Sequence, residues 1–153
     1  MLGTETTEGN ELSLLLVSIA DELYALDAGS VREVIRYRAA TPVPGAPQAL
    51  PGILSQRGAI LPVVDLRLVL GFAAAEPDRA TRLVILANAD TELALLVDRV
   101  LDLATLPPDR PEPPPAALAP ARARFIRSVA RLQADLVILL DLDAVIAALH
   151  EWT

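Results

Sequence analysis

Two short apolar runs meet at Arg57-Gly58 within residues 52–71, and this junction constrains the fold more than any other stretch of the chain. Glycine can supply the positive φ that a tight turn between strands requires, so the two runs predict a β-hairpin. Pro62 lies inside the second run. Because proline cannot donate a hydrogen bond to a neighbouring strand, we expect this strand to lie at a sheet edge or to carry a bulge.

A helix signal follows the hairpin. Asp65 can accept a backbone N–H of the next turn, and Gly71 is a suitable left-handed stop, so residues 66–70 are predicted to form a short helix. The same signal recurs at Asp141, which precedes the amphipathic run 142–149. We interpret both aspartates as helix caps.

The chain repeats itself at a long spacing. Residues 22–26 leading to 31–35 are similar to 92–96 leading to 97–101, and residues 63–70 are similar to 139–146. Two copies of a strand-rich unit in the same order predict two small barrels side by side, because the period is too long for a solenoid. The apolar run at 14–17 is continuous, which suits a strand buried on both faces. Strands are expected at residues 12–19, 23–26, 31–38, 82–87, 93–103, 125–132 and 136–140.

Two segments lack such patterns. Residues 1–11 are small and polar, and we expect them to be flexible. Residues 107–120 contain seven prolines and are predicted to form an irregular, partly extended excursion. The alternative, a proline-rich ligand for an aromatic-lined groove, is disfavoured because predicted strands flank the segment on both sides.

Composition limits the compartment and the class of partner. The 153 residues are 53% hydrophobic with a net charge of −7, which predicts a globular protein and disfavours nucleic acid or an anionic membrane as partner. There is no cysteine, the N-terminus lacks the apolar segment of a signal peptide, and no run is long enough to insert into a membrane. The cytoplasm is the expected compartment.

The usual catalytic constellations are missing. His150 is the only histidine, and all 13 cationic side chains are arginine, so a Ser-His-Asp relay, a P-loop and a Schiff base are disfavoured. Asp98 is expected in a turn or in an ion pair beside Arg99. The sequence therefore predicts a protein that is not an enzyme and has no cofactor or metal. A small carboxylate-based hydrolase or ligand-binding barrel stays open as an alternative.

One carboxylate lies on an apolar strand face. Residues 31–38 alternate, so that Glu33 shares a face with Val31, Ile35 and Tyr37. An unpaired buried carboxylate is costly. Either an arginine reaches Glu33, or this face meets a partner instead of the core.

Several short pieces occur along the chain in a characteristic order and spacing. They are Leu23-Tyr24-Ala25-Leu26, Val31-Arg32-Glu33-Val34-Ile35, Thr41-Pro42-Val43-Pro44, Gly52-Ile53-Leu54, Arg57-Gly58, Pro62-Val63-Val64-Asp65-Leu66-Arg67, Leu95-Leu96-Val97-Asp98-Arg99-Val100, Phe125-Ile126 and Leu139-Leu140-Asp141-Leu142. In this order they resemble the CheW-like family, the scaffold proteins that couple chemoreceptors to the histidine kinase CheA.

The resemblance implies a mainly β fold of two five-stranded SH3-like barrels with short helices, packed around a shared core. Residues 12–150 would then form a single domain of two intertwined β-barrel subdomains. The implied function is a non-catalytic adaptor in bacterial chemotaxis, which binds the regulatory domain of CheA and the cytoplasmic hairpin tip of a chemoreceptor. A CheW-like adaptor of a motility or gene-regulation pathway is the alternative with the same fold.

By position, the resemblance also implies partner-binding residues. They are Val31, Glu33, Ile35, Arg57 and Gly58. The alternative for Glu33 and Arg57 is an ion pair within the molecule, and for Gly58 a purely structural turn. The chain departs from the family pattern at two places: Ser55-Gln56 replaces the usual Asn-Leu before Arg57, and Ser128 replaces a glycine.

Overall fold

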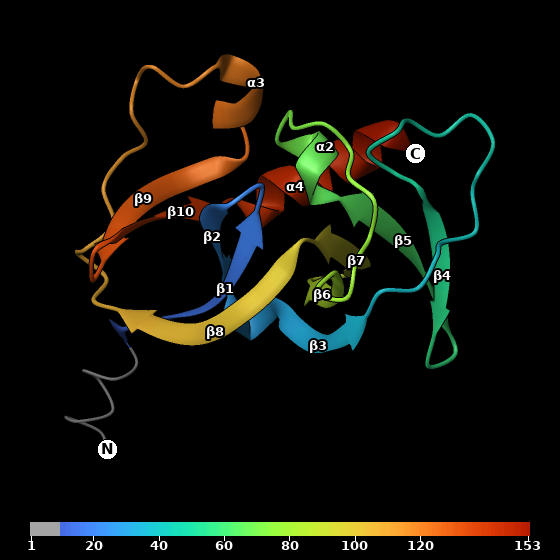
Figure 1. Ribbon diagram of the computed structural model, residues 1–153, viewed down its shortest axis with the longest axis horizontal. Coiled ribbons are helices and arrows are strands. Elements are labelled where there is room, and N and C mark those ends of the chain that lie inside the picture. The colour runs from blue at the N-terminus through green and yellow to red at the C-terminus, as the bar shows by residue number, and fades with distance from the viewer. Residues whose placement is uncertain (1–9) are drawn as a thin grey trace.

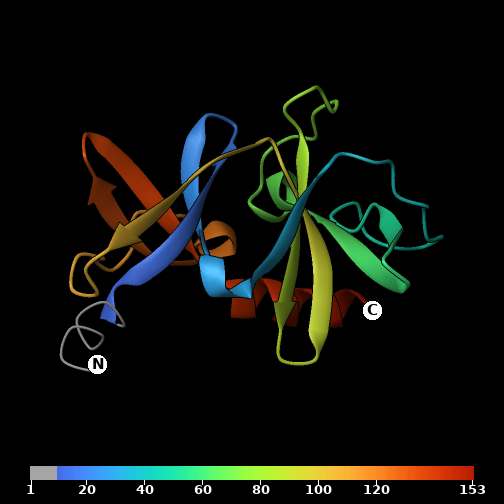
Figure 2. The ribbon, with the colours of Figure 1, turned by 90° about the horizontal axis from the view of Figure 1, so that it is seen from below.

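The computed structural model describes residues 10–153, which form two five-stranded sheets side by side (Figures 1 and 2). Sheet A has the strand order β8-β1-β2-β10-β9, and sheet B has the order β3-β6-β7-β5-β4. The predicted mainly β fold is therefore confirmed. The predicted flexible segment 1–11 lies outside the described residues except for its last two. The strands are β1 (Leu12–Ile19), β2 (Glu22–Asp27), β3 (Val31–Arg36), β4 (Gly52–Gln56), β5 (Ala59–Asp65), β6 (Arg82–Asn88), β7 (Thr91–Val97), β8 (Arg99–Leu106), β9 (Ile126–Leu132) and β10 (Asp135–Leu140).

Each sheet combines strands from both halves of the chain. In sheet A, β1 pairs with β8 and β2 pairs with β10, while in sheet B, β6 pairs with β3 and β7 pairs with β5. The β2–β10 and β5–β7 pairings are parallel, and the remaining ones are antiparallel. Figure 2 shows β3 and β8 crossing between the two sheets. The repeat seen in the sequence thus corresponds to β1–β5 and β6–β10, and neither repeat completes a sheet alone.

The largest hydrophobic cluster lies between the sheets. It joins buried side chains of both sheets with those of the C-terminal helix, and each sheet encloses a smaller cluster of its own. Side chains alternate along β1, so Leu15 and Val17 belong to the shared cluster, whereas Leu14 and Leu16 belong to the cluster of sheet A. The expectation that this strand is buried on both faces is confirmed.

Two aspartates start the helices that follow the parallel strands. The Asp65 carboxylate accepts the Arg67 N–H at 3.0 Å, and the Asp141 carboxylate accepts the Ala144 N–H at 3.1 Å. Both predicted caps are confirmed, and Gly71 has the expected positive φ of 89°. None of the helices in residues 10–153 is long and apolar enough to cross a membrane. The helices are η1 (Ala28–Ser30), α2 (Leu66–Val69), α3 (Pro120–Ala123) and α4 (Leu142–Trp152).

The predicted hairpin is present, but its second strand is not at a sheet edge. Arg57 and Gly58 both have positive φ, 51° and 80°, as a two-residue turn between twisted strands requires. β5 lies between β4 and β7. Its pairing with β7 begins only at Val63, so Pro62 faces no partner strand on that side. The central strand β5 therefore tolerates Pro62 because its hydrogen bonding with β7 starts one residue later, at Val63.

The predicted strand at residues 93–103 is in fact two strands. β7 ends at Val97 in sheet B, Asp98 interrupts the ladder, and β8 continues into sheet A. Apolar residues on both sides of Asp98-Arg99 led to the prediction of a single strand. The proline-rich excursion between β8 and β9 is irregular, as predicted, and is held by a backbone bridge between Glu112 and Val129.

Candidate partner-binding surface

The structure brings two of the five predicted partner-binding residues into direct contact. Arg57 Nε lies 3.0 Å from Glu33 Oε1, and an Arg57 Nη lies 2.9 Å from Glu33 Oε2. β3 and β4 are the two outer strands of sheet B. The bidentate pair therefore spans the seam where the two outer strands of this barrel approach each other.

Further contacts support this seam. Gln56 donates to Glu33 Oε1 at 3.3 Å and accepts a hydrogen bond from Arg38, which also donates to the Ser55 carbonyl at 3.1 Å. Just beyond, Thr41 and Ile53 exchange two backbone hydrogen bonds of 2.9 Å. Gln56, one of the departures from the family pattern, is thus a working part of the network. The sequence does not single it out because its partners Glu33 and Arg38 lie 23 and 18 residues away along the chain.

The exposure of the pair differs between its members. The Glu33 side chain is 27% exposed, whereas the Arg57 side chain is 75% exposed. Hydrogen bonding from Arg57 lowers the pKa of the Glu33 carboxyl from its ordinary value, partial burial opposes this, and Gln56 adds to the lowering. The same pair raises the pKa of Arg57. Glu33 therefore stays ionised into the acidic range, and Arg57 presents a fixed cationic surface beside it.

The other predicted residues play different local parts. Val31 and Ile35 are half-buried and pack against the shared cluster and the sheet B cluster respectively. Gly58 occupies the second turn position, and no atom lies within 4 Å of the place where a Cβ would stand. The exposed apolar residue of β3 is Val34, on the opposite face of the strand from Glu33.

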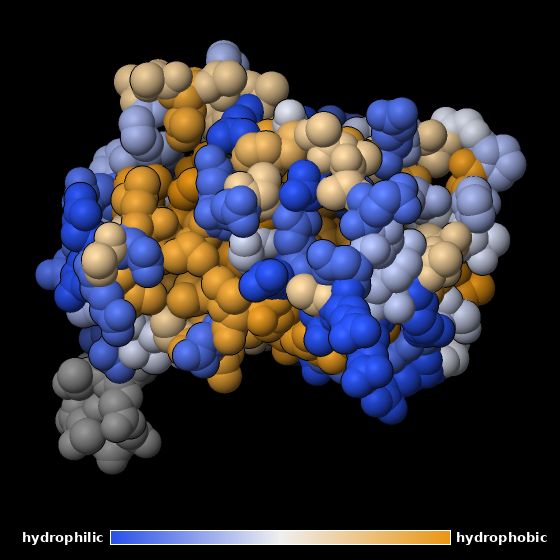
Figure 3. All heavy atoms as spheres, viewed as in Figure 1, coloured by the Kyte–Doolittle hydropathy of each residue, from blue (hydrophilic) through white to orange (hydrophobic). Residues whose placement is uncertain are grey.

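A second candidate surface lies on sheet A and was missed in the sequence analysis. Leu101 and Leu103 on β8 are 46% and 68% exposed, and a β-bulge at Leu101 adds an unpaired residue to this strand. Figure 3 shows hydrophobic side chains gathered over the region of β1, β8 and β9. The signal was present in the alternation along residues 99–106, but the prediction of one long strand through 93–103 obscured it.

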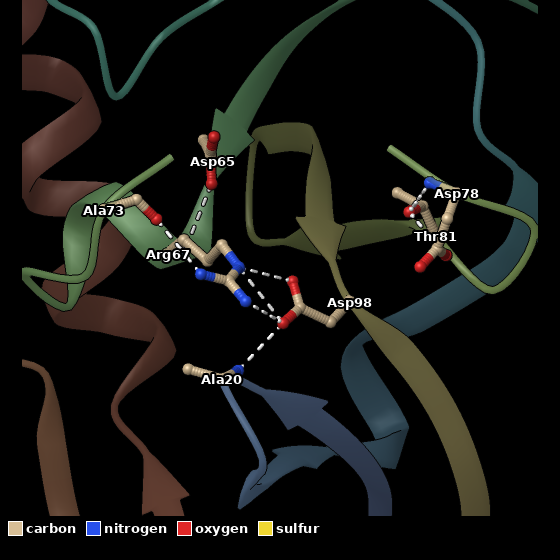
Figure 4. A network of polar contacts seen from close by, with 7 residues as sticks. All are labelled: Ala20, Asp65, Arg67, Ala73, Asp78, Thr81 and Asp98. Atoms are coloured by element: carbon tan, nitrogen blue, oxygen red, sulfur yellow. Dashed lines mark hydrogen bonds and ion pairs between the residues drawn. The ribbon is translucent and has the colours of Figure 1, made fainter. Parts of the chain in front are cut away.

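A polar junction holds the two sheets in register near this surface (Figure 4). Asp98 Oδ2 accepts the Ala20 N–H of the β1–β2 turn at 2.8 Å. Arg67 of α2 makes a bidentate contact with the same carboxylate, with Nε 2.9 Å from Oδ1 and an Nη 2.9 Å from Oδ2. The ion pair expected for Asp98 exists, but its partner is Arg67 and not the neighbouring Arg99. Asp98 thereby connects three chain segments.

Two of the carboxylates hold helix N-termini. Asp65 and Asp141 are engaged as helix caps, and burial raises the pKa of Asp65 while the Leu68 and Arg67 N–H groups oppose this. Within the part of the chain that the structure describes, no three His, Cys, Asp or Glu side chains gather as a metal site would require.

Comparison with known proteins agrees with this architecture. The family model described as a CheW-like domain matches residues 13–150. A chemotaxis protein CheW of Rhizobium meliloti is 31% identical over 140 residues, which cover 92% of this chain and 89% of that protein. A chemotaxis protein CheW of Bacillus subtilis is 26% identical, covering 93% and 90%. The crystal structure of the scaffolding protein TtCheW from Thermoanaerobacter tengcongensis superposes with a TM-score of 0.78 at 28% identity, covering 85% of this chain and 88% of that one. The chain belongs to the CheW-like domain family.

Proposed function

We propose that this protein is a coupling adaptor of bacterial chemotaxis that bridges chemoreceptors and the CheA histidine kinase by positioning and not by chemistry. The observation that carries the proposal is the CheW-like match, which spans both sheets, from residue 13 to residue 150. The relatives named as chemotaxis proteins favour this pathway over motility or gene regulation. The engaged state of Asp65 and Asp141 gives the hydrolase alternative no support.

Two separate surfaces suit an adaptor. The Glu33–Arg57 seam on sheet B combines a half-buried carboxylate, an exposed arginine and nearby apolar residues, as the rim and centre of protein interfaces do. We assign it to the regulatory domain of CheA. The exposed leucines of β8 on sheet A offer an apolar contact to the helices of a receptor hairpin tip. Because the surfaces lie on different sheets, both partners can bind at once.

The adaptor would act as one unit in the cytoplasm. The shared cluster and the Asp98 junction connect the sheets, which supports treating residues 12–150 as a single domain of two intertwined subdomains. A fixed angle between the sheets would fix the relative position of kinase and receptor.

Calorimetric titration against the CheA regulatory domain from the same genome tests the proposal. We expect saturable binding at low micromolar concentration or better. Glu33→Lys should weaken it about tenfold or more, because it breaks the pair with Arg57 and reverses the charge at the seam. Glu92→Lys is the matched control, since it makes the same charge change at an exposed position of β7.

The outcomes separate the site from the function. No binding by the folded protein would refute the adaptor assignment. Binding that survives Glu33→Lys unchanged would keep the adaptor and move the kinase surface away from the seam. The receptor surface is tested in parallel by Leu103→Ser, which should weaken binding of a receptor hairpin peptide but not of the kinase domain.

A further inference from the structure

A pocket of about 740 Å³ opens at the C-terminal end of β3, where Arg36 of β3 pairs with Arg82 of β6. Three of its seven lining residues are arginine. Figure 3 shows strongly hydrophilic side chains gathered over this end of β3. The lining residues are Arg36, Tyr37, Pro77, Asp78, Arg79, Thr81 and Arg82.

Two of these arginines oppose each other directly. Arg36 of β3 is the register partner of Arg82 of β6 in the antiparallel ladder. Side chains at directly opposed positions are close neighbours, and like charges there destabilise the sheet. No carboxylate of residues 10–153 lies within ion-pair distance of Arg36, Arg79 or Arg82. The fold thus accepts a repulsion that an anion placed between the two guanidinium groups would remove.

The loop that completes the pocket is held in place. Arg82 donates to the Arg79 carbonyl at 2.7 Å and to the Thr81 carbonyl at 2.9 Å, which leaves its other N–H groups for a ligand. The one carboxylate in the lining, Asp78, accepts the Ala80 N–H at 2.8 Å and the Thr81 hydroxyl at 3.4 Å. Asp78 is therefore engaged by its own turn and does not neutralise the arginines by contact.

We propose that this arginine pocket binds an acidic segment of a protein partner, with carboxylates seated between Arg36 and Arg82. Guanidinium groups bind carboxylates through paired, charge-assisted hydrogen bonds. The exposed Tyr37 ring, which also lines the pocket, adds an apolar contact and a hydroxyl. The net charge of −7 repels long polyanions and anionic membranes, whereas a short acidic segment meets only the local positive field. This inference is independent of the adaptor assignment.

A fluorescein-labelled octaglutamate peptide is the probe, measured by fluorescence anisotropy on the whole protein at several salt concentrations. We expect saturable binding that weakens with added salt. Arg36→Gln should weaken it about fivefold or more, while the thermal midpoint stays equal or rises, because a like-charge contact is removed and the Arg36 side chain has no other partner in residues 10–153. Arg82→Gln should weaken binding similarly.

The matched control is Arg131→Gln, which removes one exposed positive charge on β9 and should leave binding unchanged. If Arg131→Gln and Arg36→Gln weaken octaglutamate binding equally, the effect depends only on net charge and the proposed site is wrong. Pyrophosphate is the competitor: displacement of the peptide at comparable concentration would assign the pocket to small free anions and overturn the acidic segment. Failure of octaglutamate to bind the folded protein at low salt would also refute the proposal.

Discussion

The Asp98 junction gives a quantitative prediction. Asp98→Ala removes the acceptor of the Ala20 N–H and the carboxylate that binds Arg67. Loss of a partly buried hydrogen bond costs about 1 kcal/mol. The ion pair is partly exposed, with side chains 23% and 28% exposed, and is worth about 1 kcal/mol at most after solvent screening. The substitution should therefore lower the free energy of unfolding by about 2 kcal/mol, which corresponds to about 6 °C in the thermal midpoint for a chain of this size.

Asp98→Asn separates the two contributions. Asparagine keeps one side-chain oxygen for the Ala20 N–H but loses the charge that binds Arg67, so about half of the loss is expected, or about 3 °C. Asp135→Ala changes an exposed aspartate at the start of β10 and should stay within about 0.5 kcal/mol of the wild type. Thermal unfolding and urea unfolding, both followed by circular dichroism, give the midpoint and the free energy of unfolding of all three variants.

Amide hydrogen exchange at Ala20 gives a local readout. In Asp98→Ala the Ala20 N–H should exchange much faster than in the wild type, whereas in Asp98→Asn it should stay protected. A midpoint for Asp98→Ala within about 1 °C of the wild type would refute the reasoning. So would equal exchange rates at Ala20 in the two variants.

Four further predictions concern stability. Glu33→Lys should leave the thermal midpoint within a few degrees of the wild type, since the pair lies at the surface with Arg57 75% exposed; a large drop would make Glu33 a folding residue. Asp65→Asn should keep the midpoint within about 1 °C because asparagine also caps helices, whereas Asp65→Ala should cost about 1 kcal/mol. Burial raises the pKa of Asp65, so protonation of this carboxyl favours the folded state. This proton-linked stabilisation is full below the unfolded pKa of about 3.9 and is lost as pH rises through the raised pKa. Urea titrations at several pH values should show the loss in the wild type and not in Asp65→Asn. Residues 12–150 should unfold in one calorimetric transition whose enthalpy equals the van't Hoff value, and two separate transitions would contradict the single domain.

Features encoded by neighbouring residues could be predicted from the sequence. The turn at Arg57-Gly58 and the caps at Asp65 and Asp141 depend on backbone chemistry within a few residues, and all three are present as expected. The sequence left open whether an arginine or a partner protein meets Glu33, and in the structure Arg57 forms an ion pair with it. Both residues had been singled out, but only the fold brings them together.

Features that depend on pairing across the sheets could not be predicted in this way. The edge position expected for the strand of Pro62 was wrong because it depends on where β7 begins to pair. The change of sheet at Asp98 goes with its contacts to Ala20 and Arg67, which are distant along the chain. The arginine pocket likewise exists only through the register of Arg36 with Arg82.

β3 pairs in sheet B although β1 and β2 pair in sheet A, and β8 pairs in sheet A although β6 and β7 pair in sheet B. The chain therefore has the arrangement of a strand-swapped dimer whose two subunits have been joined through the loop between α2 and β6. A cut in that loop would give two fragments whose sheets are each incomplete, so each should fold only on mixing with the other. In the intact chain the tether makes this association intramolecular. Its stability is thus independent of its own concentration, unlike that of an obligate dimer.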